Sequence, residues 1–290
     1  MKRKFIALAF LLFTCNILAA PKQQNFEFIE FPGAESTTTR GINKAGATVG
    51  SYYAGAGEKG YIRSAAGAFT TIEVPGALAT SPWGVDDSRV VGTFFDGFPS
   101  PETIEVHGFV YENGQVTALD YPGAAMTQAY GVSTAGVVGI IQGGSPFGYH
   151  GFLYSNGGQW TQLDVPGAAQ TFAWGISQNG QVVGGWNDAA SGARRGFIYT
   201  AGSYAIHDFP RPGTYATELY AINGVGSILG AVSNGGCNFE PFVFSRLGKY
   251  IMLDLPGAFI TGINDSGYVV GIFGVGNKGF IAKASSFIVK

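Results

Sequence analysis

The chain contains 290 residues, of which 46% are hydrophobic, 14% aromatic and 12% charged, and 46 of them are glycines. Its formal net charge is −2, and no run of basic residues follows residue 20, which argues against nucleic acids and anionic membrane surfaces as partners. Abundant glycine and aromatic residues with few charges are typical of many short strands joined by tight turns.

Residues 1–20 have the pattern of a secretory signal peptide. Basic residues 2–4 precede an apolar stretch over residues 5–19, which is too short to span a bilayer comfortably and ends in small residues suited to cleavage. We therefore expect a secreted or periplasmic protein in which residues 21–290 form a single domain that does not insert into a membrane.

Removal of this segment would leave 14 basic and 19 acidic residues, a net charge of −5. Cys237 is the only cysteine after residue 20, so no disulfide can form within the mature chain and packing alone must hold it together. We expect a monomer with no cofactor and no bound metal.

From residue 26 onward the sequence repeats itself six times. A typical copy contains a strand ending in Pro-Gly, a Gly-Ile or Gly-Val step followed by Asn, Ser or Asp, a Val-Gly pair, and a Gly-Phe or Gly-Tyr pair. The fifth copy departs most, with Ala221 in place of the glycine before Ile222 and Pro241 in place of the glycine before Phe242. The prolines are 43, 47, 44, 46 and 44 residues apart, at Pro32, Pro75, Pro122, Pro166, Pro212 and Pro256. A period of this length indicates an architecture in which each repeat buries its faces against its neighbours.

The second copy illustrates the strands that we expect in every repeat. Residues 69–74 alternate like a half-buried strand, and Pro75-Gly76 suits a type II turn, since proline presets φ and glycine supplies a positive φ. Two more strands are expected at residues 90–94 and 108–111, and a fourth leads into the Gly-Val step. Four short strands in each of six repeats predict an all-β fold, a six-bladed β-propeller of four-stranded antiparallel blades.

The strand at residues 25–31 is a spare copy of the Pro-Gly strand. We expect it to complete the last blade, which would close the ring and protect an exposed edge.

The repeats resemble the bacterial extracellular repeats of the HAF family, in the variant with Pro-Gly-Ala after the strand. The resemblance covers residues 26–290 and implies an exported β-propeller, but it brings no catalytic motif. The matching segments include Thr71-Ile72-Glu73-Val74-Pro75-Gly76-Ala77, His107-Gly108-Phe109-Val110-Tyr111 and Gly262-Ile263-Asn264-Asp265-Ser266-Gly267.

A largely aromatic set lies just before the Gly-Ile or Gly-Val step. If this strand is innermost, the set clusters around the axis and could stack on sugar rings, with Arg40 as a polar group; the alternative, which we favour, is packing between blades. The candidate ligand-binding residues are Arg40, Trp83, Tyr130, Trp174 and Tyr220, and Thr261 holds the sixth position.

Each repeat also has one carboxylate before its Pro-Gly turn, at Glu30, Glu73, Asp120, Asp164, Asp208 and Asp254. Paired carboxylates can cleave glycosidic bonds, but a catalytic pair would break the symmetry, so we expect these groups to cap turn amides. Another repeat position, held by Lys59, His107, His150, Arg195, Glu240 and Lys278, is expected to be a solvated strand end.

The residue after each Gly-Ile or Gly-Val step is Asn, Asp or Ser, namely Asn43, Asp86, Ser133, Ser177, Asn223 or Asn264. We expect each side chain to fold back onto the amides of its own turn.

The variable loops differ between repeats, and loops on a rigid scaffold often carry binding residues. Their candidate binding residues are Phe98, Tyr149, Arg194 and Phe239. The alternative is that these are solvent-exposed loop residues with no binding role.

These patterns predict an exported, non-catalytic binding propeller that recognises a glycan or a cell-surface polymer, with an envelope protein as another possible partner. The alternatives are a polysaccharide lyase or glycosidase with a carboxylate pair in the central channel, and a protein-interaction scaffold. An enzyme should have a unique polar cluster in one or two repeats, and the sequence reveals none. We therefore assign no catalytic or metal-binding residue.

Overall fold

The computed structural model describes residues 26–55, 57–96, 105–143, 148–235, 239–274 and 277–289. The expected signal peptide, the candidate loop residue Phe98 and the lone Cys237 lie outside the described residues.

The described residues form 24 strands and one short 3₁₀ helix. The first sheet contains β2 (Ser36–Ile42), β3 (Thr48–Tyr53), β4 (Glu58–Arg63) and β5 (Phe69–Ile72). The second contains β6 (Ala79–Val85), β7 (Arg89–Asp96), β8 (Glu105–Glu112) and β9 (Gln115–Leu119). The third contains β10 (Met126–Ser133), β11 (Gly136–Gly143), β12 (Gly148–Ser155) and β13 (Trp160–Leu163).

The fourth sheet contains β14 (Ala168–Ile176), β15 (Val182–Asp188), β16 (Arg194–Thr200) and β17 (Ser203–His207). The fifth contains β18 (Ala216–Ile222), β19 (Ile228–Ser233), β20 (Glu240–Phe244) and β21 (Tyr250–Met252). The sixth contains β22 (Ala258–Ile263), β23 (Tyr268–Phe273) and β24 (Lys278–Lys283), and the N-terminal β1 (Phe26–Ile29) pairs with β24. The helix η1 spans Ala284–Phe287.

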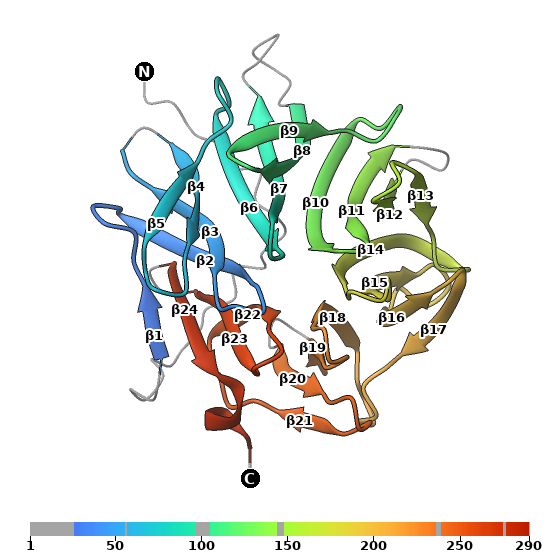
Figure 1. Ribbon diagram of the computed structural model, residues 1–290. Helices are drawn as coiled ribbons and strands as arrows, with labels where there is room; N and C mark the ends of the chain where they lie inside the picture. The colour runs from blue at the N-terminus through green and yellow to red at the C-terminus, as the bar shows by residue number, and fades with distance from the viewer. Residues whose placement is uncertain are drawn as a thin grey trace, which may run out of the picture.

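Within each of these sheets the strands pair in an antiparallel manner, and the sheets are arranged around a common axis (Figure 1). Hydrogen bonds between them extend the pairing into one network of 16 strands and one of 8. The first strand of each sheet lies nearest the axis, and the fourth lies at the periphery. Four single parallel bridges join the third strand of one sheet to the first strand of the next, for example Glu58 to Ala79 and Arg194 to Ala216. Sheets that radiate from one axis define a β-propeller, which confirms the all-β prediction.

The core lies between neighbouring sheets, and its largest members are the aromatic residues of the Gly-Phe or Gly-Tyr pairs, together with Phe242, which follows Pro241 in the fifth repeat. Tyr61, Phe109, Phe152, Phe197, Phe242 and Phe280 are all fully buried. The ring of Phe109 covers the glycine of the Val-Gly pair, where a Cβ on Gly92 would lie 2.7 Å from the ring and 2.3 Å from the carbonyl oxygen of Ser81. The Val-Gly consensus therefore reflects close packing, because a side chain at this position has no room.

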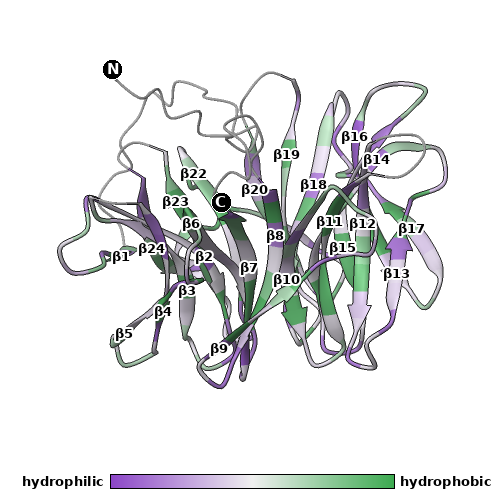
Figure 2. Cartoon of the chain, turned by 90° about the horizontal axis from the view of Figure 1, so that it is seen from above, coloured by the Kyte–Doolittle hydropathy of each residue, from purple (hydrophilic) through white to green (hydrophobic). Residues whose placement is uncertain are grey.

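The hydrophobic colouring follows the strands, whereas the turns at both ends of the axis are more polar (Figure 2). The glycine of the Pro-Gly turn adopts the positive φ that a type II turn needs, for example +86° at Gly76. No helix in the described ranges is long and apolar enough to cross a membrane.

The two ends of the chain meet in one sheet. Strand β1 pairs with β24 in a register that runs from Phe26 opposite Ala282 to Ile29 opposite Gly279. Beyond η1, Ile288 forms a bridge with Leu253 next to the outer strand β21, so the C-terminal segment links the fifth and sixth sheets.

Candidate functional site

All six inner strands contain a β-bulge at the same repeat position. The register shifts fall between Thr39 and Gly41, and at the equivalent pairs in β6, β10, β14, β18 and β22. The extra residue in each bulge is the member of the largely aromatic set, from Arg40 to Thr261. Bulges re-aim side chains, so this set leaves the ordinary alternation of the strand.

Four members of this set form a continuous arc across four sheets. The Arg40 guanidinium lies 4.5 Å from the centre of the Trp83 ring, Trp83 meets Tyr130 edge-to-face at 5.0 Å, and Tyr130 meets Trp174 at 4.7 Å. Tyr130 is only 5% exposed, and burial raises its pKa well above the ordinary value. These contacts are packing between sheets, the interpretation that we favoured for the set.

Tyr220, the fifth member of the set, packs edge-to-face on Phe259, with ring centres 5.2 Å apart. Burial raises the pKa of Tyr220 to about 12. The hydroxyl of Thr261, the sixth member, donates a 3.5 Å hydrogen bond to the carbonyl oxygen of Thr39. The ligand role predicted for the set stays a prediction.

A buried carboxylate between the fourth and fifth sheets breaks the repeat symmetry of the inner strands. Glu218 on β18 is 1% exposed, forms a close ion pair with Arg194 of β16, and accepts a 3.1 Å hydrogen bond from the Trp174 indole. The same repeat position holds Thr38, Ser81, Gln128 and two phenylalanines elsewhere. The expectation that no unique polar cluster exists is therefore wrong. The sequence offered one clue to it, an acidic residue within an inner strand that is otherwise expected to be buried.

A second Arg–Glu pair lies at the joint between the first and second sheets. Arg40 lies 3.6 Å from Glu58, whose carboxylate also accepts a 2.7 Å hydrogen bond from the hydroxyl of Ser81. Each of the two glutamates is held by a guanidinium. Each glutamate is thus paired with an arginine. Glycoside cleavage instead needs two carboxyl groups that flank the scissile bond, one as acid and the other as base or nucleophile.

The residues that follow the Gly-Ile or Gly-Val steps do cap their own turns. The Asn43 carboxamide oxygen accepts the amide of Ala47 at 2.8 Å, and Asn223 and Asn264 repeat this contact. Asp86 accepts the amides of Ser88 and Arg89, and the serines at the other two positions also accept amides. The capping prediction is confirmed in all six repeats.

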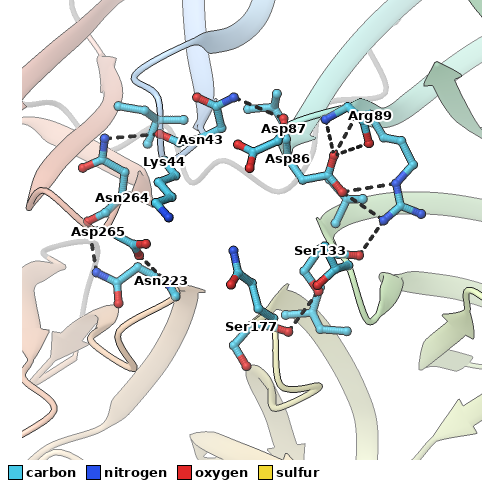
Figure 3. Close-up of a pocket in the computed structure, with 18 of the residues that line it drawn as sticks. Asn43, Lys44, Asp86, Asp87, Arg89, Ser133, Ser177, Asn223, Asn264 and Asp265 are labelled. Atoms are coloured by element: carbon cyan, nitrogen blue, oxygen red, sulfur yellow. Dashed lines mark hydrogen bonds and ion pairs between the residues drawn. The ribbon is translucent and has the colours of Figure 1, made fainter. Parts of the chain in front are cut away.

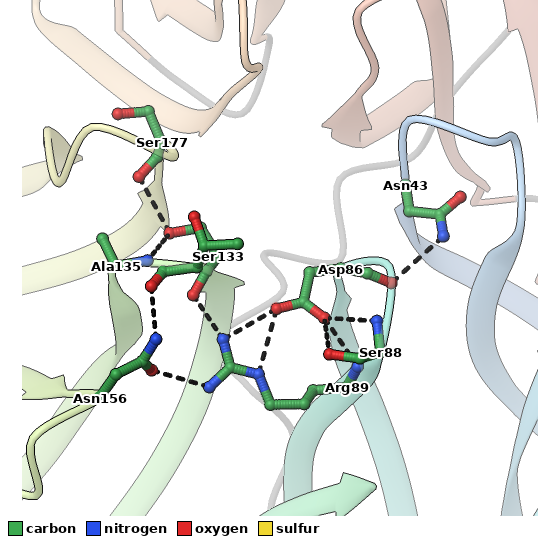
Figure 4. A network of polar contacts seen from close by, with 9 residues as sticks. Asn43, Asp86, Ser88, Arg89, Ser133, Ala135, Asn156 and Ser177 are labelled. Atoms are coloured by element: carbon green, nitrogen blue, oxygen red, sulfur yellow. Dashed lines mark hydrogen bonds and ion pairs between the residues drawn. The ribbon is translucent and has the colours of Figure 1, made fainter. Parts of the chain in front are cut away.

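The same side chains also bridge neighbouring repeats, which the sequence did not reveal. Asn43 donates to the carbonyl oxygen of Asp86 at 3.2 Å, and Ser133 donates to that of Ser177 at 2.9 Å (Figure 4). At the aspartate position Arg89 makes the bridge: it is paired with Asp86 and donates to the carbonyl oxygen of Ser133 at 2.6 Å. Two further bonds join Asn223 to Asn264 and Asn264 to Asn43.

This ring of turns surrounds a cavity of about 430 Å³ at the end of the axis where the inner strands finish (Figure 3). We call it the central pocket. Its floor is aliphatic, and its rim carries the six turn residues with Lys44, Asp87, Gln178 and Asp265 beside them. The floor consists of Ile42, Val85, Val132, Ile176, Ile222 and Ile263.

The repeat symmetry of the rim is broken at the residue after each capping residue. Lys44 and Asp87 are exposed and point into the pocket, and Asp265 accepts the amide of Gly224 at 2.6 Å. Gln178 and Thr134 hold two of the remaining equivalent positions. The pocket therefore combines a symmetric frame with a small number of individual polar groups.

The carboxylates before the Pro-Gly turns lie at the other end of the axis, which we call the loop end. Among the described residues, none of their side chains accepts a turn amide, so that expectation is wrong. In five repeats the amide after the carboxylate instead donates to a threonine hydroxyl of the next inner strand, as Val165 does to Thr171 at 3.1 Å. The other such threonines are Thr37, Thr80, Thr127 and Thr217.

Five of the six carboxylates contact the position that we expected to be a solvated strand end. His150 lies 2.7 Å from Asp164, and the equivalent pairs are Lys59–Glu73, His107–Asp120, Arg195–Asp208 and Lys278–Glu30. In the fifth sheet, where this position is Glu240, the inserted Arg211 binds it through two contacts of 2.7 and 3.1 Å. Two repeat sets that seemed unrelated in the sequence are therefore partners.

The loop candidates Tyr149, Arg194 and Phe239 share one repeat position at the start of the third strand or just before it. The Tyr149 ring lies 5.9 Å from Phe172, and the Arg194 guanidinium lies over that same ring at 5.0 Å. Phe239 is half-buried. Tyr149 and Arg194 therefore come together beside Trp174, whereas Phe239 lies in the neighbouring sheet.

Among the described residues, no group of three or more His, Cys, Asp or Glu side chains could hold a metal ion.

No protein-family model matches the sequence, and no curated protein matches it. Among solved structures, TolB from Acinetobacter baumannii is 12% identical over 85% of this chain and 62% of TolB, with a TM-score of 0.52. Virginiamycin B lyase from Staphylococcus aureus is 10% identical over 89% of this chain and 98% of the lyase, with a TM-score of 0.50. An acylaminoacyl peptidase from Pyrococcus horikoshii is 9% identical over 77% of this chain and 39% of the peptidase, with a TM-score of 0.52.

These low identities bear on the fold alone, and they support the β-propeller class. A propeller scaffold can carry unrelated activities, so function must be argued from the site.

Proposed function

We propose that the chain is an exported, non-catalytic binding protein that holds a glycan or a cell-surface polymer in the central pocket. In this proposal the six sheets are the blades of a six-bladed propeller, β1 closes the ring, and the repeats are of the HAF type. Residues 1–20 act as the signal peptide, and residues 21–290 form a monomeric domain.

One observation carries this proposal: every repeat contributes to a single cavity on the axis. Its volume of about 430 Å³ falls within the range of about 300–1,000 Å³ that is usual for small-molecule sites. Cross-repeat hydrogen bonds at five of the six joints hold the rim in place without a ligand, so binding would not have to order it.

The chemistry of the pocket suits a sugar. A sugar ring has apolar faces and hydroxyl groups that both donate and accept hydrogen bonds. The aliphatic floor matches the apolar face, and the amide, hydroxyl and carboxylate groups of the rim match the hydroxyls. Lys44, Asp87 and Gln178 are the groups that would choose among sugars, because they differ between repeats.

A glycan array tests the proposal with the mature protein, residues 21–290. We expect retention on a related group of glycans and a loss of at least fivefold in affinity for Lys44→Ala and Asp87→Ala. Lys249→Ala serves as the matched control, since this exposed lysine lies outside the pocket. Silence across the array would favour the protein-scaffold alternative, and release of sugar fragments from a bound polymer would favour the glycosidase or lyase alternative.

A further inference from the structure

A second cavity lies at the loop end, between the fourth and fifth sheets, and it gathers cationic side chains. Its volume is about 240 Å³, and Arg194, Arg195 and Arg211 all line it. The whole sequence contains only eight arginines and carries a net negative charge, so three in one cavity form a marked local concentration. We call this cavity the arginine pocket.

Carboxylates hold each of the three guanidinium groups from one side. Arg195 lies 2.5 Å from Asp208, and its Nε lies 3.7 Å from Asp188. Arg211 binds Glu240 with both terminal nitrogens. Of these three carboxylates, only Asp208 lines the pocket. Because guanidinium has five N–H donors, these pairs fix the arginines in place while leaving donors for a further partner.

Arg194 is the most available of the three. Its Nε faces Glu218, while its two terminal nitrogens have no hydrogen-bond acceptor within the described ranges. Burial lowers the pKa of Arg194, which indicates that this cation has lost part of its hydration. A partly desolvated guanidinium with free terminal N–H groups is suited to a bidentate oxyanion.

The remaining wall of the pocket is apolar and exposed. Tyr215 is 59% exposed, and Phe209 lies beneath the Arg211 guanidinium at 5.3 Å. Both flank the segment Pro210-Arg211-Pro212, which departs from the repeat pattern and supplies Arg211. The arginine pocket is therefore specific to this joint between sheets and does not recur by symmetry.

We propose that the arginine pocket binds the oxyanion of an acidic glycan, with Arg194 and Arg195 on the charged group and the Tyr215 ring against the adjacent sugar. This site lies at the opposite end of the axis from the central pocket and goes beyond the function proposed for it. It adds a requirement for negative charge that the central pocket does not impose.

Affinity electrophoresis of the mature protein through gels containing polygalacturonate, dextran sulfate or neutral dextran tests the proposal. We expect retardation by at least one anionic polymer, none by dextran, and weaker retardation at higher salt, since exposed charges are screened. Tyr215→Ala and Arg211→Gln should weaken binding at least tenfold. Arg246→Gln, an equal charge change at an exposed arginine outside the pocket, should leave it unchanged.

Arg194→Gln alone would leave Glu218 buried without its cation, so the double variant Arg194→Gln/Glu218→Gln provides the folded comparison. It removes both charges, and its thermal unfolding should stay cooperative while anionic retardation falls at least tenfold. Polygalacturonate and dextran sulfate distinguish a carboxylate from a sulfate as the source of the oxyanion. The same gels are run with the Lys44→Ala/Asp87→Ala variant, so that binding in the central pocket does not contribute. In that background, equal retardation by dextran, no retardation by either anionic polymer, or an equal loss on adding Arg246→Gln would overturn the inference.

Discussion

The side-chain amide of Asn264 donates a 3.2 Å hydrogen bond to the backbone carbonyl oxygen of Asn43, across 221 residues of sequence. The same atoms are joined between Asn223 and Asn264, at 3.0 Å. The bond between the last and the first repeat is therefore built like the bonds between consecutive repeats. The first and last repeats are therefore joined in the same way as two consecutive repeats.

Replacement of Asn264 by alanine should destabilise the protein by about 1–3 kcal/mol, because it removes both the turn cap and the bond to Asn43. Ser177→Ala is the matched comparison, since the Ser177 hydroxyl makes only local contacts among the described residues. Urea unfolding measures the free-energy difference. Equal losses in the two variants would show that the cross-repeat bond contributes nothing.

Trp174→Ala should lower the free energy of unfolding by about 3–5 kcal/mol if the aromatic arc serves to pack the sheets together. The indole stacks on Phe172 at 5.6 Å, meets Tyr130 edge-to-face and donates to Glu218, so all three contacts are lost. Trp174→Phe should cost less, because it keeps a ring in the arc. Near-native stability of the alanine variant, combined with loss of glycan binding, would instead support the ligand role of the set.

Thr171→Val should destabilise the protein by about 1–3 kcal/mol, because the buried amide of Val165 loses its only acceptor among the described residues. Thr171 is 1% exposed, and valine has nearly the same shape, so little packing is lost. The exposed Thr70 on β5 is the control, and Thr70→Val should change stability by less than about 0.5 kcal/mol. Thermal unfolding of the two variants decides whether the threonine cap is needed.

His207 should make stability depend on pH. Its Nε2 lies 2.9 Å from the Tyr250 hydroxyl, and burial lowers its pKa, with a smaller opposing effect from Asp208. A pKa that is lower in the folded state means that the unfolded chain binds the proton first. This contribution to stability is therefore complete above the ordinary pKa of about 6.5 and is lost as the pH falls below it.

The variant His207→Gln isolates this contribution. We expect the wild-type protein to lose more stability than the variant when urea unfolding is compared at pH 7.5 and pH 5. A wild-type protein that gains stability relative to the variant at pH 5 would contradict the direction of the shift.

The repeat pattern predicted the strands, the Pro-Gly turns and the capping residues, because all of these depend on contacts within a few residues. Asn43 caps its own turn as expected, but its donation to Asp86 was missed. The hydrogen bond between His150 and Asp164 was missed for a similar reason: each position was interpreted alone. A period shows which positions are equivalent and does not show which of them face each other.

The sequence by itself determined the all-β class, the repeat length and the turn chemistry, since a proline, a glycine with positive φ and a capping side chain act through local backbone geometry. Only the tertiary structure decided what lies at each end of the axis. The central pocket and the arginine pocket depend on how closely neighbouring sheets approach and how far each side chain reaches across the joint. The pair of Glu218 with Arg194 shows this most clearly, because two residues 24 positions apart meet only where two sheets pack.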